Sequence, residues 1–347
     1  RLPWGCAVLA ALAVPLAARP FVLWHGLHGR TPRAVGRAAV AERVQAAEAD
    51  GASRALLEEL EALAEAGDAA AQFRLGKALR KGKGVPRDPE RAFELIKKAA
   101  DQDLVKAQAL VGFMFAKGDG CDMDEQEALD YLTMAGEQGH SNAAYGAGVL
   151  HWEGTGFEDE EQDIVGAAYW WKRAATAGHA EASFRLANLL MDEDSGITRN
   201  DTAAALLFEQ AAEEGHEGAQ EALAMMCLRG VGVKQDIDSA LELFEMSAEN
   251  GNAESAYVLG SLLRQGSGTA KDPAAAVKWL TMAGDGGHAK AASELGIMFL
   301  TGEGAPMDEE GAAYWFGRAE ELEAKSRPTR PSQDPQRVKL RPIIPRG

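Results

Sequence analysis

The chain has 347 residues, a net charge of −17 and only 7% aromatic residues, with many alanines. Its two ends are basic and its middle is strongly acidic, which excludes a groove that binds nucleic acid phosphates. The length alone would suggest two or three globular domains, but an internal repeat indicates one array instead.

Residues 1–33 form a leader and a linker. Residues 2–18 are apolar, follow an arginine and end in small residues, a pattern typical of a secretory signal peptide. A membrane anchor extending through Trp24 is the competing interpretation, although Pro15 and Arg19 interrupt it. The leader predicts the secretory pathway, in the endoplasmic reticulum lumen or at its membrane. A gene-model artefact or a cytosolic leader, and with it a cytoplasmic protein, is the alternative.

Residues 20–29 (PFVLWHGLHG) are an apolar run that ends in His-Gly motifs. The run resembles the first strand and oxyanion loop of a palmitoyl-thioesterase-type α/β-hydrolase, which implies a role for His25-Gly26 in stabilising a tetrahedral intermediate. No Gly-x-Ser-x-Gly nucleophile elbow follows, and helical repeats fill the rest of the chain. A hydrolase is therefore the disfavoured alternative.

Residues 34–66 are predicted to form N-terminal capping helices. The segment 56–66 (LLEELEALAEA) ends before Gly67, which stands where later repeats have their closing glycine. We expect this segment to be the second helix of a degenerate unit that covers the first full repeat.

A helix–turn–helix unit of about 36 residues then occurs seven times between residues 67 and 323. Its first helix ends at a Gly-x-Gly turn, because glycine enters left-handed conformations without steric cost. The turn recurs at Gly82/Gly84, Gly118/Gly120, Gly154/Gly156, Gly230/Gly232, Gly266/Gly268 and Gly302/Gly304, and a degenerate copy keeps Gly196.

The second helix of each unit begins after a capping residue and ends before a closing glycine. The capping residues are Asp88, Asp124, Asp163, Asn200, Asp236, Asp272 and Asp308. The closing residues are Gly139, Gly178, Gly215, Gly251 and Gly287, with Asp103 in the first repeat. A large residue recurs inside the helix at Leu95, Tyr131, Trp170, Leu207, Leu243, Trp279 and Trp315.

Small residues indicate how closely these helices pack. The first helices contain Leu-Gly pairs such as Leu75-Gly76 and Leu259-Gly260, which place a large side chain beside a gap. Neither helix of a unit can bury its apolar stripe alone, so the units must stack. The sequence predicts an all-α fold, a right-handed α/α superhelical solenoid with a degenerate N-terminal cap.

The pattern A-x-x-x-L-G-x-x-Y/L-x-x-G-x-G-V-x-x-D-x-x-x-A-x-x-W-x-x-x-A-A-x-x-G resembles that of the Sel-1-like repeat family, relatives of the tetratricopeptide repeats. The resemblance covers residues 67–323. It implies a non-enzymatic scaffold and, with a genuine leader, an endoplasmic-reticulum adaptor that presents misfolded glycoproteins to a membrane ubiquitin ligase. A cytosolic signalling adaptor is the alternative.

By analogy with tetratricopeptide geometry, the first helices should line a concave groove for a protein or peptide. The predicted groove residues are Lys77, Arg80, Phe113, Val149, Trp152, Asn188, Met191, Met225, Ser261, Arg264 and Ile297. Trp152 stands where other repeats have arginine, which favours exposure and ligand contact over packing beneath the acidic loop that follows.

No catalytic, metal or cofactor site is predicted. His140, His179, His216 and His288 recur just after a closing glycine, so helix capping explains them better than zinc binding. Cys121 lies three repeats away from the next cysteine in the array, too far for a disulfide.

Two features remain. Asn200 begins an Asn-x-Thr acceptor sequon at an exposed helix start, and we expect a glycan there if the chain is secreted in a eukaryote. Residues 324–347 form a basic, proline-rich tail without periodicity that is predicted to be disordered.

Overall fold

The computed structural model describes residues 54–155 and 162–326. The chain divides into two units after Glu59; the first unit is described only over residues 54–59, and the second contains all the repeats. The leader, the His25-Gly26 motif, residues 34–53 and the tail from residue 327 on lie outside the described residues. Residues 324–326, which were predicted to begin the disordered tail, are instead the last residues of a helix that ends at Ser326.

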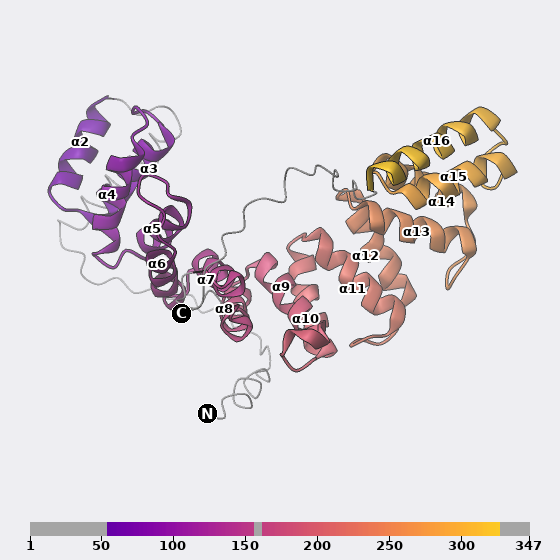
Figure 1. The fold of residues 1–347 in the computed structure, drawn as a ribbon, viewed down its shortest axis with the longest axis horizontal. Coiled ribbons are helices and arrows are strands. Elements are labelled where there is room, and N and C mark those ends of the chain that lie inside the picture. The colour runs from indigo at the N-terminus through magenta and orange to yellow at the C-terminus, as the bar shows by residue number, and fades with distance from the viewer. Residues whose placement is uncertain (1–53, 156–161, 327–347) are drawn as a thin grey trace, which may run out of the picture. The chain divides into compact units, whose positions relative to one another are not determined.

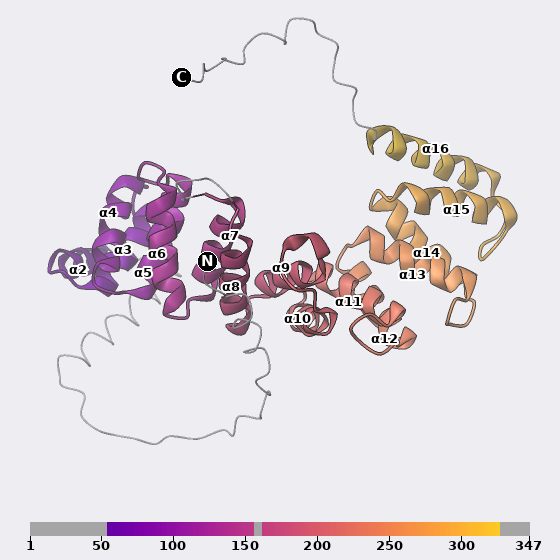
Figure 2. The same cartoon turned by 60° about the horizontal axis from the view of Figure 1, so that its bottom comes forward.

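The described residues form helices and contain no strand, which confirms the all-α solenoid (Figure 1). After α2 (Arg54–Glu65), the first helices of the repeats are α3 (Ala69–Lys81), α5 (Val105–Lys117), α7 (Ser141–Glu153), α9 (Ala180–Met191), α11 (Glu217–Arg229), α13 (Ala253–Gln265) and α15 (Ala289–Thr301). The second helices are α4 (Pro89–Ala100), α6 (Glu125–Glu137), α8 (Ile164–Thr176), α10 (Asp201–Glu213), α12 (Ile237–Glu249), α14 (Pro273–Asp285) and α16 (Glu309–Ser326), and a 3-10 turn, η2 (Glu193–Ser195), follows α9. From α3 on, each helix packs against the next along the chain, and Figure 2 shows α13 to α16 stacked in this order.

The helix ends lie where the sequence predicts them. The Asp88 carboxylate accepts a hydrogen bond of 3.0 Å from the backbone N–H of Arg91, and the caps of the next five second helices act in the same way. Asp308, before the last second helix, accepts from the N–H of Glu310 instead. The closing glycines all have positive φ, and Asp103 adopts the same left-handed conformation with φ of 61°. The backbone geometry of the closing position is therefore kept even where glycine is absent.

The Leu-Gly pairs admit the second helix of the same repeat. A Cβ on Gly76 would lie 2.5 Å from the Ile96 side chain, and one on Gly260 would lie 2.7 Å from Leu280. In the five repeats with glycine at this position, the eighth residue of the second helix thus fills the gap in its own first helix. The seventh residue, the one that the repeat pattern highlights, faces the preceding second helix instead: Trp170 lies against Gly136.

Buried glutamines link neighbouring repeats. Gln108 is fully buried in α5, and its side-chain oxygen accepts a 2.8 Å hydrogen bond from Gln138 of the same repeat. Gln220 receives an equivalent bond of 3.1 Å from Asn250, and the Gln220 amide in turn donates to the carbonyl oxygen of Ala212 in the preceding repeat at 3.3 Å. These polar contacts satisfy groups that would be costly to bury alone.

The buried apolar residues form two clusters rather than one. The first runs from Ile96 in α4 to Met226 in α11, and the second runs from Ala224 in α11 to Ala319 in α16. Cys227 and Leu243 are only partly buried and pack against both clusters. The core is therefore thinnest between α10 and α12.

Candidate functional site

Three of the predicted groove residues line one cavity of about 580 Å³. Trp152 comes from the end of α7, and Asn188 and Met191 come from the last turns of α9. The cavity is completed by residues that sequence analysis did not single out: Trp171, Glu181, Phe184, Arg185, Leu189 and Asp192. One continuous site thus forms across the third and fourth repeats.

Trp152 forms part of the wall of this cavity. Its ring lies 5.8 Å from that of Trp171, with the two planes at 37°, and its side chain is half-buried against the core. Trp171 is only 2% exposed, because its indole fills the gap at Gly148 in α7. Trp152 therefore packs on the array and also presents part of its surface to the cavity. The acidic loop that we expected to compete for Trp152 lies mostly outside the described residues.

Arg185 places a cation beside these rings. Its guanidinium lies 5.7 Å from the centre of the Trp171 ring, and its Nε donates a 2.7 Å hydrogen bond to Glu181. Glu181 also pairs with Nε2 of His216 at 2.9 Å. Burial raises the pKa of Glu181, but the hydrogen bonds from His216 and Arg185 outweigh it and leave the pKa below its usual value. The carboxylate stays ionised and holds Arg185 in place.

The signal for the residues that we missed was present in the sequence. Trp171 follows Trp170 directly in the sequence. Trp170 packs against the preceding repeat, and Trp171 packs between the two helices of its own repeat. Arg185 and Glu181 are four residues apart on α9, which places them on one helix face.

The two predicted groove arginines hold neighbouring repeats together. Nε of Arg80 lies 2.6 Å from Asp119 in the turn of the next repeat. Arg264 makes the equivalent pair with Glu303 at 3.0 Å and a second one with Glu294 at 3.3 Å. Trp152 occupies the same position in its own repeat, and Asp192 lies beside it in the cavity wall. Between the third and fourth repeats, the cavity at Trp152 thus takes the place of the ion pair that Arg80 and Arg264 form between other repeats.

The remaining predicted groove residues are spread over α7 and the other first helices. Lys77 lies 5.6 Å over the Phe73 ring, and Ile297 is 43% exposed. Partly buried positions are Phe113, Val149, Met225 and Ser261. None of these residues lines the cavity at Trp152.

The recurring histidines cap first helices, as predicted. Nδ1 of each accepts a hydrogen bond of 3.1–3.2 Å from the backbone N–H three residues later; the four are His140, His179, His216 and His288. Because Nδ1 is the acceptor, each ring carries its proton on Nε2. Within residues 54–155 and 162–326, no group of three or more His, Cys, Asp or Glu side chains could hold a metal ion.

Three further sequence predictions concern single positions. Asn200 is exposed, and its side-chain oxygen caps α10 by accepting a 3.0 Å hydrogen bond from Ala203. Cys121 and Cys227 are both free thiols. Among the helices that the structure describes, none is long and apolar enough to cross a membrane.

Comparison with known proteins supports the repeat architecture. The family model for the Sel1 repeat matches residues 69–104, 105–140, 141–179, 180–216, 218–252, 253–288 and 289–323. The crystal structure of c5321, a protective antigen of uropathogenic Escherichia coli with an SLR fold, is 27% identical at a TM-score of 0.52; the match covers 76% of this chain and 64% of that protein.

A Sel1 repeat protein from Oxalobacter formigenes is 32% identical at a TM-score of 0.51, over 62% of this chain and 85% of that one. The chain has no match among curated proteins. Of the two matched structures, the chain spans somewhat less than two thirds of the E. coli antigen and most of the Oxalobacter protein.

Proposed function

The chain belongs to the Sel1 repeat family, whose members are generally protein-interaction scaffolds, and we propose that it binds a protein partner at the Trp152 cavity without catalysing a reaction. One observation carries this proposal. Residues of α7, α8 and α9 line one cavity of about 580 Å³. They include the partly exposed Trp152, Arg185 held by its ion pair, and the exposed side-chain amide of Asn188.

The lining indicates what kind of segment would bind. Trp152, Phe184 and Met191 offer an aromatic and adaptable apolar wall, which suits a large apolar side chain of a peptide. Asn188 is exposed above them and can exchange hydrogen bonds with a peptide backbone. Arg185 lies within the same wall and can donate a hydrogen bond to a backbone carbonyl next to the apolar anchor, while Glu181 and Asp192 in the lining offset its charge.

A peptide-display selection on the purified chain tests this proposal. The dissociation constant of a selected peptide is then measured for wild type, Trp152→Ala and Asn188→Arg. We expect both variants to weaken binding by roughly tenfold or more, since residues at the centre of an interface carry most of its energy.

Asn188→Arg is the more informative variant because Asn188 is exposed and its replacement removes no packing. Val165→Ala is the matched control, since Val165 is 66% exposed on α8 and lies outside the cavity. Selected peptides that bind all three variants as tightly as wild type would place the binding surface elsewhere. Ester hydrolysis by the purified chain would contradict the non-enzymatic proposal and favour the hydrolase alternative.

We further propose that the chain works in the secretory pathway, as an endoplasmic-reticulum adaptor for a ubiquitin-ligase complex. The apolar leader at residues 2–18 and the exposed sequon at Asn200 support the compartment, and the ligase rests on the family resemblance. A glycosidase-sensitive mass on the peptide that contains Asn200 is the expected result. An unmodified peptide from a eukaryotic host would favour the cytosolic signalling adaptor.

A further inference from the structure

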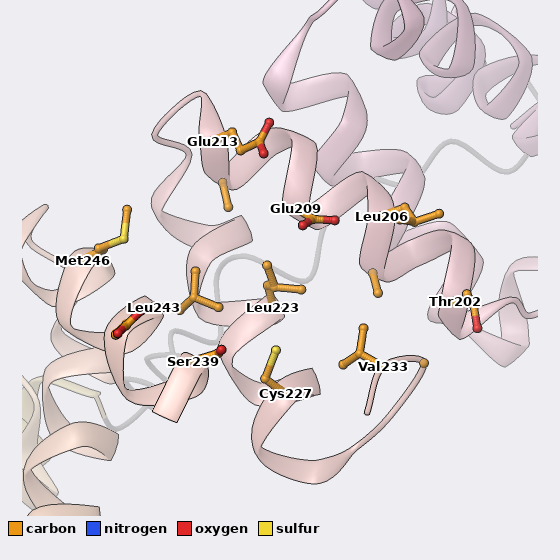
Figure 3. Close-up of a pocket in the computed structure, with 14 residues that line it drawn as sticks. Thr202, Leu206, Glu209, Glu213, Leu223, Cys227, Val233, Ser239, Leu243 and Met246 are labelled. Carbon is orange, nitrogen blue, oxygen red and sulfur yellow. The ribbon is translucent and has the colours of Figure 1, made fainter. Parts of the chain in front are cut away.

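A second cavity, of about 440 Å³, opens between α10 and α12 (Figure 3). It lies where the two buried clusters of the core meet. Figure 3 shows Leu223 and Cys227 of α11 near the centre of the cavity. Leu243 of α12 lies on one side of them, and Val233, in the turn between α11 and α12, lies on the other.

Leu243 is a leucine, as are Leu95 and Leu207, at a position where the other repeats carry a larger aromatic residue. Three other repeats have tryptophan at the position of Leu243. Trp170 and Trp315 extend to Gly136 and Gly284 of the preceding second helix, where a Cβ would come within 2.9 and 2.7 Å of the indole. Leu243 is too short to fill this space, and Ala212, the counterpart of those two glycines, lines the cavity.

Apolar side chains also stand exposed at the rim. Leu206 of α10 is 62% exposed and Met246 of α12 is 47% exposed, on opposite walls. Together with the floor of Leu223 and Leu243 they give a mainly apolar hollow. Such a combination of exposed rim and apolar floor is typical of a binding surface.

The same walls carry an unbalanced negative charge. Glu209 and Glu213 lie one turn apart on α10, and Glu242 lies opposite on α12. No lysine or arginine lines the cavity. Within the part of the chain that the structure describes, these three glutamates form no salt bridge.

The free thiol in the floor does not point to covalent chemistry. Burial raises the pKa of Cys227, and the nearby carboxylates Asp236 and Glu209 raise it further. The thiol therefore stays protonated and contributes a small apolar surface.

We propose that this cavity binds a segment of a partner protein in which a large apolar side chain lies between lysine or arginine residues. The apolar side chain takes the space that tryptophan fills in other repeats, and the flanking cations pair with Glu209 and Glu213 on one wall and Glu242 on the other. Anionic segments and nucleic acids are repelled by the same carboxylates. This site is separate from the Trp152 cavity and shares no lining residue with it.

The probe for the test is a fluorescein-labelled peptide with one tryptophan between two lysines on each side, and its binding to the full chain is followed by fluorescence polarisation. A second peptide in which glutamates replace the lysines is the charge control. We expect only the lysine peptide to bind and its affinity to fall several-fold as ionic strength rises from about 0.05 to 0.5 M, because salt screens exposed charges.

Two variants separate the apolar and the charged contributions. Leu243→Trp should fill the cavity and weaken probe binding by roughly tenfold or more. This replacement is expected to fold, because another pair of successive second helices already combines these residue types: α12 has Ala248 at the position of Ala212, and α14 has Trp279 at the position of Leu243. Glu209→Gln combined with Glu213→Gln should weaken binding by roughly fivefold without changing the packing. Glu245→Gln, on an exposed residue of α12 outside the cavity, is the matched control and should bind as wild type does.

The location is checked by the alkylation rate of Cys227 with iodoacetamide at alkaline pH. The lysine peptide should slow alkylation of Cys227 and leave that of Cys121 unchanged. The proposal is overturned if wild type does not bind the lysine peptide, if Leu243→Trp and the double glutamine variant both bind it unchanged, or if Cys227 is not protected. Binding that appears only in a chain ending at Ser326 would also overturn it, because the occupant would then be the chain's own basic tail.

Discussion

A Cβ placed on Gly120 would lie 2.0 Å from the carbonyl oxygen of Pro89, the first residue of the second helix in the preceding repeat. The same contact recurs between Gly304 and Pro273, at 2.2 Å. The first glycine of the turn ends the helix, and the second glycine therefore has a separate role. It has positive φ and also lets the turn approach the neighbouring repeat.

Gly120→Ala should consequently lower the free energy of unfolding by about 2–5 kcal/mol, from left-handed strain together with overpacking. Gly84→Ala is the matched variant, because Gly84 has positive φ but no atom within 4 Å of the Cβ position. It should cost only the backbone strain, about 1–2 kcal/mol. Urea unfolding followed by circular dichroism measures both. Equal losses would mean that the turn moves away from Pro89 without cost.

Asp103→Gly should stabilise the first repeat. Asp103 is the one described residue other than glycine with positive φ, at 61°, where five other repeats have glycine. Glycine removes the strain of this conformation and also the carboxylate that accepts a long 3.5 Å hydrogen bond from Gln108, so we expect a net gain of only about 0.5 kcal/mol in thermal or urea unfolding. Asp103→Asn is the control, since asparagine tolerates the left-handed region as well as aspartate does and should change little. A loss of stability on Asp103→Gly would mean that the hydrogen bond from Gln108 outweighs the backbone strain.

Trp279→Ala should weaken the sixth repeat and its coupling to the last one. Trp279 is 4% exposed, and truncation of a buried tryptophan costs about 3–5 kcal/mol. In an array where each repeat contacts only its neighbours, the loss should make α15 and α16 unfold at lower denaturant concentration, which hydrogen exchange resolves. Tyr314→Ala, at a position that is 61% exposed, should change stability by less than about 0.5 kcal/mol. Cooperative unfolding of the Trp279 variant at the wild-type midpoint would contradict this role.

The sequence predicted those features that depend on one or two residues close together in the chain. Asp88 begins a helix and Gly139 ends one through local backbone chemistry, and the period carried both through the array. The Trp152 site was predicted only in part. Trp152 was identified from its unusual residue type, but its contact with Trp171 depends on how α8 packs on α7, where the Trp171 indole fills the gap at Gly148.

Contacts between repeats explain the other differences. Arg80 was predicted to line the groove, and the sequence did not indicate its ion pair with Asp119, which lies 39 residues further along the chain. The cavity at Leu243 was not foreseen because a leucine at that position looks like ordinary variation. The cavity becomes apparent only in the structure, where Ala212 and Leu223 line it beside Leu243 and no side chain occupies the space that tryptophan fills in three other repeats.

The capping histidines should make the array sensitive to mild acid. Nδ1 of His140 and of His179 accepts a backbone N–H, so protonation of either ring removes a helix cap. Burial lowers the pKa of both side chains below the ordinary value near 6.5, and Lys106 lowers that of His140 further.

A base whose pKa is lower in the folded state binds fewer protons there than in the unfolded state. The stabilisation from His140 and His179 is therefore fully present above about pH 6.5 and is lost as the pH falls below that value toward the lower folded pKa. His140→Asn keeps a capping side chain that does not titrate in this range, so it should match wild type at pH 7.5 and retain more stability at pH 5. His140→Ala is the control, since it should be about 1 kcal/mol less stable than wild type at pH 7.5 and approach wild type as the pH falls, because wild type then loses the same cap. Urea midpoints at the two pH values measure these differences, and identical pH profiles for wild type and His140→Asn would show that the His140 cap does not titrate.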